Sequence, residues 1–143
     1  MKRKKNYTGS PRGGDHFCQE DLFDNPIEFE MDFYEGVLQG DPENAEILGL
    51  LGNLYTQAGM HEKGLAIDRK LVRMRPEDPV VHYNLACSLS LLKQPAEALD
   101  ELEKAIDLGY NDYIHLRSDG DLDNVRGEAR FKALVRRLLQ KIQ

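Results

Sequence analysis

The sequence has few cysteines and no long apolar run. Its two cysteines, Cys18 and Cys87, lie far apart in a chain of 143 residues, and neither belongs to a CxxC pair or to a spaced Cys/His set of the kind that binds zinc. No apolar stretch of secretory type follows the charged N-terminus, and no later run approaches the roughly 18 apolar residues that indicate a membrane span. We therefore expect a reduced, cytoplasmic protein of about one domain, without a membrane segment.

Residue patterns that carry catalysis are also missing. We find no nucleophile with a neighbouring base, no paired carboxylates and no glycine-rich loop that follows a strand. His16 and Cys18 could offer two ligands to a metal, but no second pair of ligands accompanies them. The sequence thus predicts no enzymatic activity, no cofactor and no metal site.

Positive charge is scarce outside the N-terminus. The net charge is −6, yet residues 1–15 carry +4, so the other 128 residues together carry −10. An acidic body disfavours specific binding of nucleic acid, because duplex binding draws most of its affinity from cations that neutralise phosphates. Residues 1–15 show no apolar periodicity, so we expect a disordered basic tail that serves solubility. Contact with RNA, an anionic membrane or a nuclear import receptor is an alternative role for this tail.

What the sequence does contain is helical periodicity. Apolar residues recur at three- and four-residue spacing, and Asn25 followed by Pro26 makes a favourable cap and first turn. Five helices are predicted over residues 26–39, 45–58, 62–74, 80–92 and 95–108. The connections between them have two to five residues, which forces neighbouring helices to lie antiparallel. We expect no sheet, because no strand-like alternation separates the helices.

Two of the helix pairs repeat. Residues 45–78 resemble residues 79–112 after a shift of 34 positions, and Gly52 in the first copy corresponds to Ala86 in the second. Small residues at such positions let two helix backbones approach closely. The stretches LLGNLYTQAGMHEKGL and NLACSLSLLKQPAEAL resemble the tetratricopeptide motif Leu-Gly-x-x-Tyr-x-x-x-Gly. This resemblance implies an all-α fold, a right-handed α-solenoid of antiparallel helix pairs.

The resemblance also divides the chain. The segment after Asn111, with an Asp-Leu-Asp turn and a last amphipathic helix, is similar to the end of short bacterial tetratricopeptide proteins. That last helix is expected to cap the open end of the array with Leu138 and its apolar neighbours. The predicted domain covers residues 16–143 and consists of a half-repeat at 26–44, repeats at 45–78 and 79–112, and a degenerate repeat with its cap at 113–143.

A binding site follows from the same resemblance. In this family the first helix of each repeat lines a concave groove that holds a peptide or helix of a partner protein. Carried over residue by residue, the predicted groove consists of Glu46, Gly49, Asn53, Gln57, Val80, Tyr83, Asn84, Cys87 and Leu91, with Leu50, Thr56 and Ser90 at the remaining positions. We expect Asn53, Tyr83 and Asn84 to form its centre, because amides can bond a peptide backbone and tyrosine offers a large contact surface. Val80 and Leu91 would give the groove an apolar floor.

One subfamily binds the C-terminal carboxylate of cytosolic chaperones through a clamp of Lys, Asn and Arg. Asn53 and Asn84 match its two Asn positions, whereas Gly49, Ile114 and Ser118 stand where the clamp has its cations. Without those cations the carboxylate lacks its charge-assisted hydrogen bonds. The sequence therefore favours a neutral groove over a carboxylate clamp.

Two further features leave alternatives open. The half-repeat at 26–44 would expose an apolar face, so self-association or assembly into a larger complex is an alternative function. His82 and Asp68 occupy positions where the family usually has large apolar side chains. Either they form a buried contact between neighbouring helices, or both are partly exposed and bonded to water.

Overall fold

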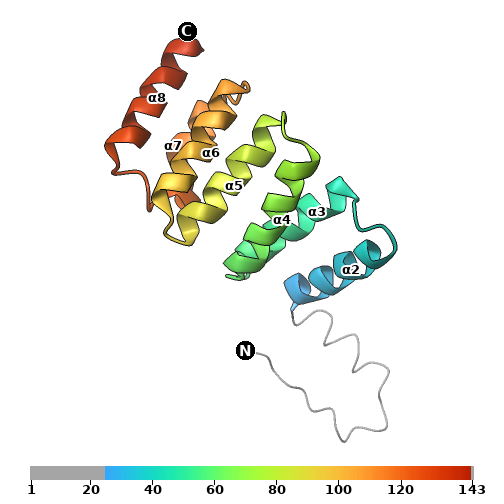
Figure 1. The fold of residues 1–143 in the computed structure, drawn as a ribbon. Helices are drawn as coiled ribbons and strands as arrows, with labels where there is room; N and C mark the ends of the chain where they lie inside the picture. Colours follow the sequence, from blue (N-terminus) through green and yellow to red (C-terminus); the bar gives the residue numbers. More distant parts are fainter. Residues whose placement is uncertain (1–24, 143) are drawn as a thin grey trace, which may run out of the picture.

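The computed structural model describes residues 25–142, which form a row of helices (Figure 1). The predictions for the tail at residues 1–15, for residues 16–24 and for the pair His16 and Cys18 lie outside the described residues. In chain order the elements are α2 (Pro26–Gly40), α3 (Ala45–Gln57), α4 (His61–Met74), α5 (Pro79–Leu91), α6 (Pro95–Asp107), α7 (Tyr113–Ser118), the 3-10 turn η1 (Gly120–Leu122) and α8 (Ala129–Lys141). In Figure 1 they follow one another from α2 at one end of the row to α8 at the other.

Local chemistry explains where the helices begin and end. Asn25, Asn44 and Asp78 each accept a hydrogen bond from a backbone N–H in the first turn of the helix that follows, which satisfies a donor that has no partner within the helix. Gly59, with φ of 80°, ends the α3 segment in a left-handed conformation that suits glycine. The prediction of an all-α fold built from antiparallel helix pairs is confirmed: within residues 25–142 there are seven α-helices and no strand.

The α3 and α4 helices pack closely because two glycines lie at their contact. A Cβ atom added to Gly52 would lie 3.2 Å from Ile67 Cγ2, and one added to Gly64 would lie 3.2 Å from Thr56 Oγ1. Larger residues at either position would separate the two helices. The expectation that small residues permit a close approach therefore holds for this helix pair.

The α5 helix lies at the centre of the fold. It packs against α4 on one side and against α6 and η1 on the other, and it is buried almost all round. Leu89 of α5 joins Leu102 and Ile106 of α6 and Leu122 of η1 in the main apolar core. Helix α5 therefore presents side chains to both halves of the molecule.

The two ends of the row differ. Helix α8 buries Phe131, Leu134 and Leu138 on one face, whereas α2 buries none of its residues and leaves Phe29 and Phe33 48% and 58% exposed. The division of the chain into a half-repeat, two repeats and a cap stays a prediction. Within residues 25–142, no helix combines the length and apolar character that crossing a membrane requires.

Candidate peptide-binding pocket

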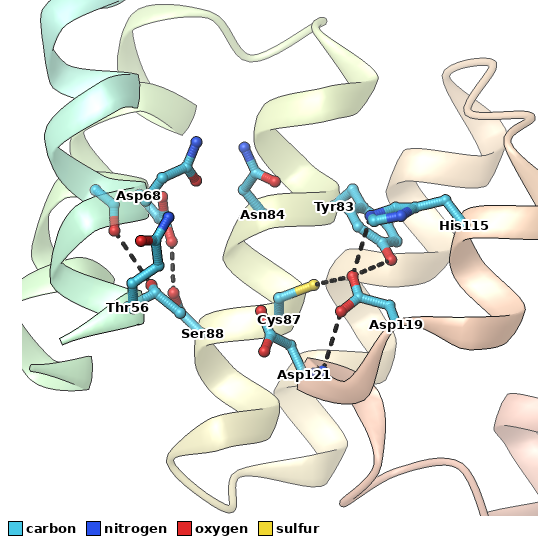
Figure 2. A pocket seen from close by; sticks show the side chains of 12 residues that line it. Thr56, Asp68, Tyr83, Asn84, Cys87, Ser88, His115, Asp119 and Asp121 are labelled. Atoms are coloured by element: carbon cyan, nitrogen blue, oxygen red, sulfur yellow. Dashed lines mark hydrogen bonds and ion pairs between the residues drawn. The ribbon is translucent and has the colours of Figure 1, made fainter. Parts of the chain in front are cut away.

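A pocket of about 380 Å³ opens where α3, α4, α5 and the α7–η1 segment meet (Figure 2). Its lining is mostly polar and comprises Gly52, Asn53, Thr56, Gln57, Asp68, Tyr83, Asn84, Cys87, Ser88, His115, Asp119 and Asp121. Figure 2 shows Asp68 on one side, Asn84 and Cys87 on the central helix, and His115 with Asp119 on the other side. The pocket thus joins elements that lie far apart in the sequence.

Part of the predicted groove lies at this pocket. The lining includes five of the nine predicted residues, which are Asn53, Gln57, Tyr83, Asn84 and Cys87. The other four, Glu46, Gly49, Val80 and Leu91, lie outside it. Val80 and Leu91 therefore do not form an apolar floor for this pocket. A binding role for any of the nine stays a prediction.

Tyr83 is buried rather than presented to a partner. Its ring stacks on that of Tyr110 with centroids 4.4 Å apart, its hydroxyl donates to Asp119 Oδ2 over 2.7 Å, and the residue is 3% exposed. The expectation that Tyr83 offers a large contact surface is therefore wrong. The repeat pattern assigns Tyr110 no packing role, so the stacked pair was not foreseen.

Asp119 is the centre of the polar cluster. Its Oδ2 accepts from Tyr83, lies 3.6 Å from the Cys87 thiol sulfur and lies 3.2 Å from His115 Nε2. Its Oδ1 accepts from the backbone N–H of Asp121 and so caps the η1 turn. One carboxylate therefore orders both the turn and the wall of the pocket.

Hydrogen bonds from Arg126 and Asn124 hold the segment that carries Asp119 in place. The Arg126 guanidinium donates to the backbone carbonyls of Leu116, Arg117 and Asp119. Asn124 donates to the Ser90 carbonyl of α5 over 2.8 Å. The Arg126 hydrogen bonds close the α7–η1 segment on itself, and the Asn124 hydrogen bond attaches it to the central helix, so both help to position its two carboxylates.

Burial raises the pKa values of two acids and a thiol in the pocket. It raises the pKa of Asp68 to about 6, although the hydrogen bond from Ser88 acts in the opposite direction. Burial, with the neighbouring Asp119 charge, also raises the pKa of Asp121. The pKa of the Cys87 thiol is raised by burial and by the same carboxylates, so this thiol stays protonated at neutral pH. Perturbed acids gathered in a cleft are typical of functional sites.

The first of the two alternatives, a buried contact between His82 and Asp68, does not form. Asp68 Oδ2 accepts from the Ser88 hydroxyl over 2.5 Å, while His82 Nδ1 pairs with Glu101 and its Nε2 with the Pro76 carbonyl, each over 2.7 Å. Ser88, the partner of Asp68, lies six residues beyond His82 on α5. About 9 Å of helix therefore separates His82 from the place where Asp68 is bound. The alternative of partly exposed side chains is also wrong, because both residues are buried.

Three potential metal ligands also meet in the pocket. The Cys87 sulfur and one oxygen each of Asp119 and Asp121 lie within 4.8 Å of one another. This cluster could not be foreseen from the repeat pattern, because Asp119 and Asp121 belong to a segment outside the repeat register. Three donors are the fewest that a zinc site uses, and only one of these is a sulfur or nitrogen ligand, so the set fits a metal weakly.

Comparison with known proteins identifies the repeat. Residues 80–109 match the family model for the tetratricopeptide repeat. Two proteins of Arabidopsis thaliana are similar to the chain: a chloroplastic protein is 33% identical over 88 residues, and a CTR9 homolog is 38% identical over 72 residues. These matches cover 59% and 50% of this chain but only 26% and 6% of the two relatives.

Solved structures resemble the fold. Two structures of MamA superpose with TM-scores of 0.62 and 0.63, at identities of 23% and 18%. They cover 90% and 89% of this chain, and 71% and 69% of the MamA chains. Residues 80–109 therefore form a tetratricopeptide repeat, within an all-helical fold similar to that of MamA. Such repeats generally mediate protein–protein interactions.

Proposed function

We propose that this protein is an interaction module that holds a peptide or helix of a partner protein in the pocket between α3, α5 and the α7–η1 segment. The observation that carries the proposal is the amide pair Asn53 and Asn84, which line the same pocket from two neighbouring helix pairs. Amide side chains both donate and accept, so together they can bond the backbone of a bound segment. The role is that of an adaptor or scaffold, as in co-chaperones, and it needs no catalytic group.

The pocket argues against a carboxylate clamp. Its lining contains three aspartates and no lysine or arginine, so an incoming carboxylate would meet like charge instead of cations. The partner segment is therefore an internal or basic one and not a chain terminus recognised by its carboxylate.

Affinity capture with the full-length double variant Asn53→Ala/Asn84→Ala tests the proposal. We expect this variant to keep its helicity and lose most of the partners that wild type captures from native lysate. The matched control, Asn111→Ala/Gln140→Ala, removes two exposed amides outside the pocket and should capture the wild-type set. Equal capture by both double variants would show that the pocket is not the binding site.

A second candidate function is assembly through α2. Within the described chain, Phe29 and Phe33 are exposed large apolar residues on a helix that buries none of its own. Light scattering on wild type and on Phe29→Ser/Phe33→Ser separates the two functions. A dimer that the double change converts to monomer favours self-association, whereas a wild-type monomer excludes it.

A further inference from the structure

We propose that the pocket receives the cationic side chain of the bound partner segment, an arginine or lysine whose charged head lies between the carboxylates of Asp119 and Asp121. The inference rests on the proposed function and names the chemistry of the partner.

The lining of the pocket is acidic. Three of the twelve lining residues are aspartates, and none is a lysine or arginine. The guanidinium of Arg126, which holds the same segment, is engaged with backbone carbonyls and with Asp123, so it does not neutralise the pocket. The described lining therefore has three carboxylates, no lysine or arginine, and His115 as its one basic side chain. A concave acidic surface with low-dielectric walls concentrates cations.

Two of the pocket's carboxylates lie close together. One oxygen of Asp119 and one of Asp121 lie within 4.8 Å of each other, on a segment that other residues hold rigid. A guanidinium presents five N–H donors in a fixed planar fork, which suits two neighbouring carboxylates. The two acids also repel each other, since the Asp119 charge helps to raise the pKa of Asp121. A cation placed between them relieves that repulsion.

Asp68 is a third carboxylate, on the opposite wall of the pocket. It is 8% exposed and lines the pocket, and its Oδ2 accepts from Ser88. Among the side chains of residues 25–142, Ser88 alone donates to this carboxylate. A largely buried carboxylate with so few donors carries a desolvation penalty, which a donor from a bound segment would reduce. Another N–H of the bound segment can supply such a donor while the cationic head lies between Asp119 and Asp121.

The pocket can admit this side chain without a rearrangement of the fold. The partner of Asp119 at its open side is His115, whose side chain is 56% exposed on the short helix α7. When this exposed ring rotates away, Asp119 Oδ2 becomes accessible from solvent to an entering side chain.

The experiment titrates full-length ¹⁵N-labelled protein with N-acetyl-arginine methylamide, at constant ionic strength, and follows backbone amide signals. N-acetyl-citrulline methylamide is the matched neutral probe. We expect saturable shifts at Cys87, Ser88 and residues 119–121 with the arginine probe, and about tenfold weaker binding of the citrulline probe, because charge-assisted hydrogen bonds are stronger than neutral ones. Equal shifts from both probes, or none at the pocket with arginine, would overturn the inference.

Variants locate the effect. Asp121→Asn should weaken the arginine probe several-fold, as should Asp68→Asn, whose amide oxygen can still accept from Ser88. Asp32→Asn removes one charge from an exposed position on α2 and should leave binding unchanged. Shifts with Zn²⁺ alone and none with arginine would assign the cluster to a metal. A further variant replaces Lys2, Arg3, Lys4 and Lys5 by Gln. If this change shifts the amide signals of the pocket residues without any probe, the occupant is the chain's own tail. Either result contradicts a partner side chain.

The titration and the capture experiment distinguish failure of the inference from failure of the proposed function. If Asn53→Ala/Asn84→Ala loses its partners while the arginine probe does not bind, the inference falls and the proposed function stands. If the double variant keeps its partners, the proposed function falls, and the inference falls with it.

Discussion

Asp68 is ionised in the folded protein at a cost in free energy. Its pKa is about 6 against an ordinary value of 3.8, because burial penalises the charged form more than the Ser88 hydrogen bond favours it. The folded state therefore holds the proton more tightly than the unfolded state. Stability should fall as the pH rises from about 4 to about 6 through this group, and then level off.

The change Asp68→Asn removes this penalty. We expect it to raise the free energy of unfolding by up to about 3 kcal/mol at pH 7.5, and by less than half of that at pH 4.5. Urea unfolding of both proteins at the two pH values measures the difference. The exposed Asp32→Asn should change stability by less than about 0.5 kcal/mol. A gain that is the same at both pH values would show that Asp68 is not the titrating group. Loss of cation binding in the stabilised variant would indicate that stability is sacrificed for function.

His82 and Glu101 form a buried pair between α5 and α6. The Pro76 carbonyl can only accept, so His82 Nε2 carries a hydrogen, and Nδ1 faces the Glu101 carboxylate. Removal of one partner leaves the other buried and unpaired, so His82→Ala should cost about 3 to 5 kcal/mol. The double change His82→Leu/Glu101→Leu should unfold near the wild-type midpoint, since apolar residues often replace a buried pair without loss. A double variant as unstable as His82→Ala would contradict this account.

At the scale of elements, the α3–α4 contact depends on which glycine is replaced. A Cβ atom at Gly52 would lie 3.2 Å from Ile67 Cγ2, whereas a Cβ atom at Gly49 would have no such neighbour within 4 Å. We expect Gly52→Val to destabilise the protein by about 1 to 3 kcal/mol through overpacking. Gly49→Ala, about one turn earlier in the same helix, should stabilise by about 0.5 to 1 kcal/mol. Thermal unfolding of the pair checks the sign of each change, and destabilisation by both would refute the packing argument.

Helix α8 closes one end of the row. Leu138 is 1% exposed and belongs to the main core, so Leu138→Ala should cost about 2 to 4 kcal/mol in chemical unfolding. Gln140→Ala, on the exposed side of the same helix, is the control and should have little effect. Equal midpoints for the Leu138 variant and wild type would mean that α8 does not stabilise the array.

At the scale of the whole molecule, local signals were enough to predict the fold but not the site. Asn25, Asn44 and Asp78 act locally as caps, and apolar spacing determines which face of each helix is buried, so the helices could be located within one or two residues. Asn53 and Asn84 could be paired because the 34-residue repeat places both on the first helix of their helix pair.

The acidic wall could not be predicted in that way. Asp119 and Asp121 follow α7, outside the repeat register, and tertiary contacts such as the Asn124 hydrogen bond to α5 and the Tyr83 hydrogen bond to Asp119 bring them to the pocket. The sequence therefore predicted a neutral groove, whereas the structure gives the pocket three carboxylates. The sign of the charge depends on tertiary contacts that no repeat motif encodes.

Site-specific photo-crosslinking tests the central claim, that a partner segment occupies this pocket, most directly. A benzophenone amino acid is placed at Gln57, an exposed residue of the lining, or at Gln140, an exposed residue of α8, in full-length protein within cells. We predict that the probe at residue 57 crosslinks to a partner through a segment that contains arginine or lysine, and that the probe at residue 140 does not. Crosslinks to the same partner from residue 140 but not from residue 57 would place the binding surface elsewhere and contradict the account.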